Sequence, residues 1–191
     1  MNLANSLSIT RIILVPIFMV FMLNQKPFGL LIAAGIFVVA GCTDILDGYI
    51  ARKQETVSTM GKFLDPMADK LLITAGLISL VYLGYLNPWF ALIIISREFA
   101  VSWLRLILAA QGVIVMASKL GKLKNVLQIV AVVSLIVHAA FQTVWFQESA
   151  LRFFLFIPSW LIAPLALYLA VILTVVSGVE YFYRNRKNIR F

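Results

Sequence analysis

The feature that most constrains the fold of this chain is a series of six long apolar stretches. They are Leu7–Leu23, Phe28–Leu46, Leu71–Leu86, Trp89–Gln111, Val126–Phe146 and Trp160–Val179. A helix needs about 20 mostly apolar residues, with a usual range of roughly 17–25, to cross the hydrocarbon core of a bilayer. We therefore predict an all-α polytopic membrane protein with six transmembrane helices. The segment Leu151–Ser159 is apolar but shorter, and we interpret it as an interfacial or re-entrant stretch.

Composition supports a membrane protein and excludes several other classes. Apolar residues make up 62% of the 191-residue chain and charged residues only 13%, whereas soluble domains have about 45–50% and about 25%. This excludes a soluble globule and a disordered chain, and the single cysteine, Cys42, excludes a disulfide scaffold. The net charge of +8 indicates membrane topology and contacts with phosphate groups rather than a nucleic-acid partner.

The distribution of the basic residues predicts the orientation of the chain. Six spans place both termini on one side, and twelve of the sixteen Lys and Arg residues fall on that side. They are Arg11, Arg52, Lys53, Lys62, Lys70, Lys119, Lys122, Lys124, Arg184, Arg186, Lys187 and Arg190. Because cytoplasmic loops carry the excess of Lys and Arg, we expect both termini in the cytoplasm. The first span follows Arg11 as in a signal peptide, but no small-residue cleavage site follows it, so we expect it to stay attached.

Four of the eight acidic residues lie close together at the junction of the second and third stretches. Asp44 and Asp47 are three residues apart, and Asp65 and Asp69 are four apart, so on helices each pair shares one face. Antiparallel neighbours bring the two faces together near the cytoplasmic interface, where four carboxylates repel one another unless cations join them. Hard oxygen ligands suit Mg²⁺ or Mn²⁺, and two divalent ions would balance the four charges. The alternative is four interfacial acids balanced by nearby lysines and Arg52.

Small residues beside these acids indicate close approach by a ligand or another helix. Gly48 and Ala51 follow Asp44 on the same helix face, and we expect Gly61 to serve the turn into the third span. Arg52 lies near enough to take up the charge of a diphosphate bound at the metal site.

The spacing D-x2-D-G-x2-A-R-x8-G-x3-D-x3-D, over residues 44–69, resembles the signature of the CDP-alcohol phosphotransferase family, with all eight fixed positions present. The resemblance implies a single transmembrane domain over residues 1–191, a homodimer, two divalent metal ions on the four aspartates, and Asp69 as general base. It also implies that the nucleotide lies against Gly48, Ala51, Arg52 and Gly61.

Sequence outside the signature is similar to the bacterial phosphatidylglycerophosphate synthase branch of that family. The segment from Arg97 to Arg105 resembles R-E-x5-L-R, and residues 121–128 resemble G-K-x-K-T-x-x-Q, whereas Trp103 and Asn125 replace the usual Gly and Thr. Charges inside a span should face a polar cavity or a partner. With the lysines on the following loop, the two arginines form a candidate pocket for an acceptor phosphate: Arg97, Arg105, Lys119, Lys122 and Lys124. The alternative for the lysines is that they only set the membrane topology, and the alternative for the arginines is a purely structural role.

The branch implies transfer of a phosphatidyl group from CDP-diacylglycerol to sn-glycerol 3-phosphate, with release of CMP, at the cytoplasmic face of the cell membrane. A cardiolipin synthase or a phosphatidylserine synthase would carry the same eight residues. A cation transporter would need acids distributed across the bilayer, and a structural membrane protein would not need four aligned acids. His138 predicts a helix–helix hydrogen bond, and Gly76, Gly112 and Gly178 predict helix packing only.

Overall fold

The computed structural model describes residues 3–54, 59–112, 119–143 and 159–186, with side chains except at 3–8, 44–54, 59–69 and 119. Within these ranges the chain forms six helices and no strand, which confirms the all-α prediction for the described residues. The helices are α1 (Leu3–Leu23), α2 (Pro27–Gln54), α3 (Thr59–Tyr82), α4 (Pro88–Ala110), α5 (Lys119–Phe141) and α8 (Ser159–Asn185). Each overlaps one of the six predicted stretches. The predicted interfacial segment lies outside the described residues, apart from Ser159, where α8 begins.

Local chemistry explains the two ends of α4. The side chain of Asn87 accepts a hydrogen bond from the backbone N–H of Trp89 at 3.0 Å, and Pro88 occupies the first helical position. This cap satisfies one of the N–H groups that a helix leaves without an intrahelical partner. At the other end, Gly112 has φ +77° and donates its N–H to the carbonyl of Ala109 at 3.0 Å. Glycine adopts that backbone conformation without steric cost, so it ends the helix. This corrects the prediction that Gly112 serves helix packing only, because nothing lies within 4 Å of a Cβ added there.

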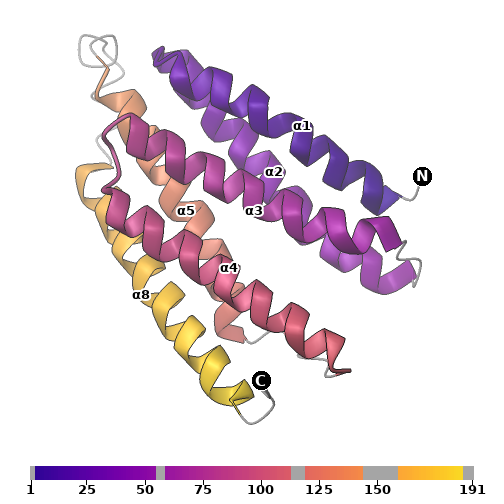
Figure 1. Ribbon diagram of the computed structural model, residues 1–191. Coiled ribbons are helices and arrows are strands. Elements are labelled where there is room, and N and C mark those ends of the chain that lie inside the picture. Colours follow the sequence, from indigo (N-terminus) through magenta and orange to yellow (C-terminus); the bar gives the residue numbers. More distant parts are fainter. Residues whose placement is uncertain (1–2, 55–58, 113–118, 144–158, 187–191) are drawn as a thin grey trace.

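The helices pack as a bundle in which α5 joins two groups (Figure 1). On one side α1 packs against α2 and α3, and on the other side α8 packs against α5 and α4. Contacts of α5 with α2 and α3, and of α4 with α3, connect the groups. The approach of α2 to α5 is close at Gly41, where an added Cβ would lie 3.0 Å from Cδ1 of Ile129.

Successive helices alternate in direction, so six helix ends gather at each end of the bundle (Figure 1). One end holds the starts of α1, α3 and α5 and the last turns of α2, α4 and α8. The first turn of α1 and the last turn of α8 therefore lie at the same end, as an even number of crossings requires. The parts of α2 and α3 that carry the signature sequence also lie at this end of the bundle.

The surface of the bundle is strongly apolar while part of its interior is polar. Large apolar side chains such as Ile13, Val20 and Ile172 are exposed, whereas Lys124 and Gln128 are buried. Water-soluble monomers rarely expose apolar patches of this extent. The helical stretches Leu120–Phe141 and Ser159–Asn185 are long and apolar enough to cross a membrane, and Ile9–Leu23, Pro27–Thr43 and Lys70–Tyr82 are shorter apolar ones. These features favour a membrane protein, and six crossings stay a prediction.

Candidate active site

The two predicted carboxylate pairs lie on neighbouring helix ends. Asp44 and Asp47 lie in the second half of α2, and Asp65 and Asp69 lie in the first half of α3. Both segments are helical and belong to the same end of the bundle (Figure 1). The side chains of all four lie outside the described residues, so the metal site stays a prediction.

The structure places the predicted nucleotide contacts on the same two helices, with one correction. Gly48, Ala51 and Arg52 continue α2. Gly61 does not form the turn into α3, because α3 begins at Thr59 and includes Gly61 in its first turn. No proline interrupts the residues between Thr59 and Asp65, so nothing ends the helix there.

The predicted loop lysines are also helical. α5 begins at Lys119, so Lys119, Lys122 and Lys124 lie in its first two turns rather than on a loop. The apolar residues Leu120 and Leu123 recur at helical spacing among them, which explains the earlier start. Lys122 is exposed, whereas only 1% of Lys124 is accessible; the side chain of Lys119 lies outside the described residues.

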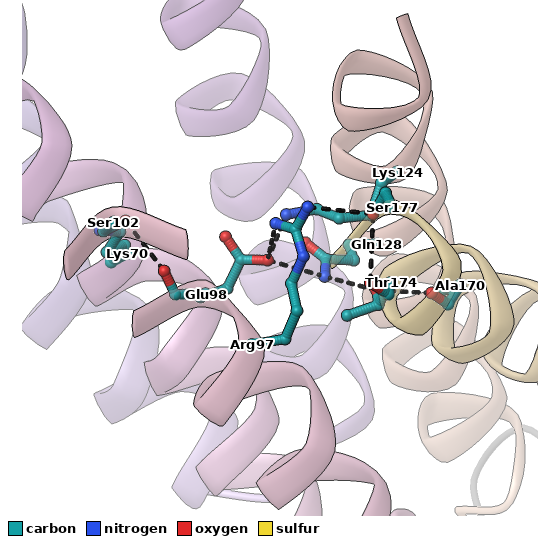
Figure 2. Close-up of polar contacts among 9 residues, drawn as sticks. All are labelled: Lys70, Arg97, Glu98, Ser102, Lys124, Gln128, Ala170, Thr174 and Ser177. Carbon is teal, nitrogen blue, oxygen red and sulfur yellow. Dashed lines mark hydrogen bonds and ion pairs between the residues drawn. The ribbon is translucent and has the colours of Figure 1, made fainter. Parts of the chain in front are cut away.

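Three polar side chains converge on one oxygen atom of Glu98, between α4 and α5 (Figure 2). Nη1 of Arg97 lies 3.3 Å from Oε1 of Glu98 and Nε2 of Gln128 lies 3.4 Å from it. Nζ of Lys124 makes an ion pair with the same oxygen. Adjacent helix positions point about 100° apart, yet the long arginine side chain reaches its neighbour. We call Arg97, Glu98, Lys124 and Gln128 the Glu98 cluster.

Hydroxyl groups of α8 complete the surroundings of this cluster (Figure 2). Oγ of Ser177 accepts a hydrogen bond from Nη2 of Arg97 at 3.0 Å, and Oγ1 of Thr174 accepts one from Nε2 of Gln128 at 3.0 Å. Both hydroxyls donate to carbonyls of their own helix, Thr174 to Ala170 at 2.6 Å and Ser177 to Thr174 at 3.1 Å. Both side chains are fully buried. Residues from α4, α5 and α8 thus form one polar network inside the bundle.

A second polar contact ties α3 to α4 beside the cluster. Nζ of Lys70, the residue after Asp69, hydrogen-bonds to Oγ of Ser102 in α4. Ser102 in turn donates to the backbone carbonyl of Glu98 at 2.9 Å. A continuous set of contacts therefore runs from the α3 helix that carries the last signature aspartate to the Glu98 cluster.

The charge of the Glu98 cluster favours an anionic ligand. Two cations share a single carboxylate, and the side chains of Arg97 and Glu98 are only 13% and 19% exposed. Ionised groups taken out of water are stabilised by opposite charge and hydrogen bonds. An arginine and a lysine that meet at one carboxylate provide donors suited to a phosphate group.

The remaining predicted acceptor residue and the two sequence departures lie on the outside of the helices. Arg105 is exposed on α4, and Asn125 is exposed on α5. Trp103 is 63% exposed, so its bulk does not fill the interior next to the cluster. The structure therefore brings Arg97 and Lys124 together and leaves Arg105 and Lys122 apart from them.

Sequence reasoning did not find Thr174 and Ser177. Their only signal is a pair of hydroxyl residues three positions apart in an apolar helix, just before Gly178. Such hydroxyls commonly bond to their own helix backbone, so the pattern alone does not indicate a side-chain partner. The prediction for His138 is confirmed, because its Nδ1 lies 3.2 Å from Oγ of Ser159, which links α5 to α8.

Comparison with known families decides the class of the protein. A sequence profile described as CDP-alcohol phosphatidyltransferase matches residues 1–176. The chain belongs to the CDP-alcohol phosphatidyltransferase family. Members of the CDP-alcohol phosphatidyltransferase family are transferases and generally depend on divalent metal ions.

Curated relatives match over nearly the whole chain. The CDP-diacylglycerol–glycerol-3-phosphate 3-phosphatidyltransferase of Bacillus subtilis (strain 168) is 44% identical over 96% of this chain and 95% of its own length. The protein of the same name from Rickettsia bellii is 35% identical over 97% and 96%. A probable phosphatidylglycerophosphate synthase of Mycobacterium tuberculosis (strain H37Rv) is 35% identical over 98% of this chain and 83% of its own.

Proposed function

We propose that this protein transfers the phosphatidyl group of CDP-diacylglycerol to sn-glycerol 3-phosphate, giving phosphatidylglycerophosphate and CMP. The observation that carries the proposal is the 44% identity, over nearly full length, to a Bacillus subtilis enzyme named for this reaction. All eight signature positions between residues 44 and 69 are present as well. The reaction belongs to phospholipid biosynthesis.

The proposed arrangement in the membrane is one domain over residues 1–191 with six crossings. Both termini and the signature end of the bundle face the cytoplasm, and the protein resides in the cell membrane as a homodimer. The six alternating helices of the described residues support an even number of crossings (Figure 1), and the twelve basic residues that the sequence predicts on one side support the orientation. A cysteine-accessibility experiment on substitutions at Arg186 and Lys26 in intact cells would test the orientation. Labelling of the Arg186 position from outside would contradict it.

We propose that Asp44, Asp47, Asp65 and Asp69 hold two divalent ions, Mg²⁺ or Mn²⁺. Four carboxylates form the hard, anionic donor set that these ions prefer, and the helices that carry them begin and end at the same end of the bundle. When bound, such ions neutralise charge on the diphosphate and stabilise the leaving CMP.

The chain's own residues bind and orient the two substrates. Gly48, Ala51 and Gly61 leave room for the nucleotide, and Arg52 takes up negative charge of the diphosphate. The 1-hydroxyl oxygen of glycerol 3-phosphate forms a bond to the lipid-side phosphorus, and the bond from that phosphorus to the oxygen of CMP breaks. Asp69 takes the hydroxyl proton as general base.

The acceptor's phosphate is assigned to Arg97, Arg105, Lys119, Lys122 and Lys124. The convergence of Arg97 and Lys124 on Glu98 supports this assignment for those two residues. The contact between Lys70 and Ser102 supports it too, because it places α4 next to the helix of Asp69. An acceptor bound there would lie near the proposed catalytic helix ends.

One assay tests the acceptor and the class of protein together. Purified protein receives CDP-diacylglycerol, Mn²⁺ and, separately, glycerol 3-phosphate, phosphatidylglycerol or serine, and CMP release is measured. We expect release with glycerol 3-phosphate. Release only with phosphatidylglycerol or serine would instead make it a cardiolipin or phosphatidylserine synthase, and no release with any acceptor would favour a transporter or a structural protein.

Substitutions then test the residue assignments. Asp65→Asn and Asp69→Asn should each abolish CMP release, and a near-normal rate in either would refute its role. Arg105→Gln should raise KM for glycerol 3-phosphate far more than KM for CDP-diacylglycerol. Equal changes in both constants would remove Arg105 from the acceptor pocket.

A further inference from the structure

Two adjacent residues of α8 determine where the side chain of Arg97 lies. An added Cβ on Gly178 would lie 3.0 Å from Cγ and 3.4 Å from Nε of Arg97. The arginine stem thus crosses α8 at the one position that lacks a side chain. This close approach corrects the expectation that Gly178 serves helix packing only, because the group it accommodates is a charged side chain.

Ser177, the residue before Gly178, fixes the guanidinium group beyond that crossing point (Figure 2). Its Oγ accepts the hydrogen bond from Nη2 at 3.0 Å, while Nη1 lies 3.3 Å from Oε1 of Glu98. Nε is buried beside Gly178 and has no hydrogen-bond partner among the described residues. The hydroxyl of Ser177 therefore orients the guanidinium group.

We propose that Ser177 and Gly178 are positioning residues that act through Arg97 on the phosphate of the acceptor. This inference rests on the proposed function and extends it to a helix that carries none of the signature residues. A free arginine side chain populates many rotamers, so a guanidinium held in advance loses less conformational freedom when it binds phosphate. Ser177 holds the head of the side chain, and Gly178 leaves the space through which its stem passes.

Matched pairs of variants separate this role from general helix stability. Ser177→Ala is compared with Ser134→Ala, because Ser134 of α5 bonds only to the carbonyl of its own helix, that of Ala131, at 2.9 Å. Gly178→Ala is compared with Gly35→Ala, where nothing lies within 4 Å of the added Cβ. KM and kcat are measured for glycerol 3-phosphate and for CDP-diacylglycerol.

We expect Ser177→Ala and Gly178→Ala to raise KM for glycerol 3-phosphate about tenfold, the scale of one lost hydrogen bond to a charged group. KM for CDP-diacylglycerol and kcat should change little, and Ser134→Ala and Gly35→Ala should behave as wild type. Equal rises in both KM values, or an effect of the controls as large as that of the test variants, would overturn the inference.

A double-substitution cycle tests whether Ser177 acts through Arg97. In an Arg97→Gln background, Ser177→Ala should add no further rise in KM for glycerol 3-phosphate, because its target is gone. If Arg97→Gln does not fold, Arg97→Lys serves as the background. If Ser177→Ala still raises KM for glycerol 3-phosphate by the full amount in that background, Ser177 acts independently of Arg97. Failure of the wild type to use glycerol 3-phosphate refutes the proposed function itself, whereas an active wild type with a normal Ser177→Ala variant refutes only this inference.

Discussion

Replacing Glu98 with glutamine should destabilise the protein strongly, because it removes the only negative charge of the Glu98 cluster. Glutamine keeps the size and the hydrogen-bonding oxygen but removes the negative charge that Arg97 and Lys124 contact. Lys124 is 1% accessible. Removing one partner of a buried ion pair costs about 3–5 kcal/mol, and since 19% of the Glu98 side chain is exposed, we expect the lower end of that range.

The matched control is Glu180→Gln in α8, which makes the same chemical change at an ion pair whose cation is exposed and whose carboxylate side chain is 30% exposed. Glu180 pairs with Arg184 at 3.3 Å, and the side chain of Arg184 is 67% exposed. An exposed pair of this spacing contributes only about 0.3–0.5 kcal/mol. The two substitutions should therefore differ several-fold in their effect.

Thermal unfolding of the purified protein in one detergent measures the difference. For a chain of this size, a loss of about 3 kcal/mol lowers Tm by roughly 6–12 °C, and the control should lower it by about 2 °C or less. The double variant Glu98→Gln with Lys124→Met removes a cation as well, so it should recover most of the loss. Equal Tm values for Glu98→Gln and Glu180→Gln would refute the charge-compensation argument.

Three other outcomes are expected. Gly76→Ala places its Cβ 2.8 Å from Cε2 of Phe37 and should destabilise the protein by about 1–3 kcal/mol through overpacking. The control Gly35→Ala, with open space around its Cβ, should be neutral or slightly stabilising. Equal effects of the two variants on Tm would contradict the packing around Gly76. Ser159→Ala removes the partner of His138 and should cost only about 0.6 kcal/mol, so a Tm loss matching that of Glu98→Gln would be inconsistent with this estimate. Chelation with EDTA should abolish CMP release and added Mg²⁺ or Mn²⁺ should restore it, whereas full activity in EDTA would exclude the metal proposal.

The apolar stretches were sufficient to predict the helices, because apolar length and periodicity are local properties of the chain. Helix ends were less predictable. α5 starts at Lys119, seven residues before the predicted Val126, since charged residues join a helix when their apolar neighbours keep its period. Gly61 in α3 is a further example, because a single glycine inside a helix costs only about 1 kcal/mol and does not end it.

The sequence by itself determined the class of this protein and the family to which it belongs. Charges are costly within apolar spans and therefore rare, so their positions and spacing carry a strong signal. Only the tertiary structure decided which side chains surround those charges. Ser177 lies 80 residues after Arg97, and its hydroxyl also satisfies a carbonyl of its own helix, so no local pattern distinguishes it from an ordinary serine of a membrane helix. Its partner depends on how α8 rotates and packs against α4, which is set by contacts distributed over the whole bundle.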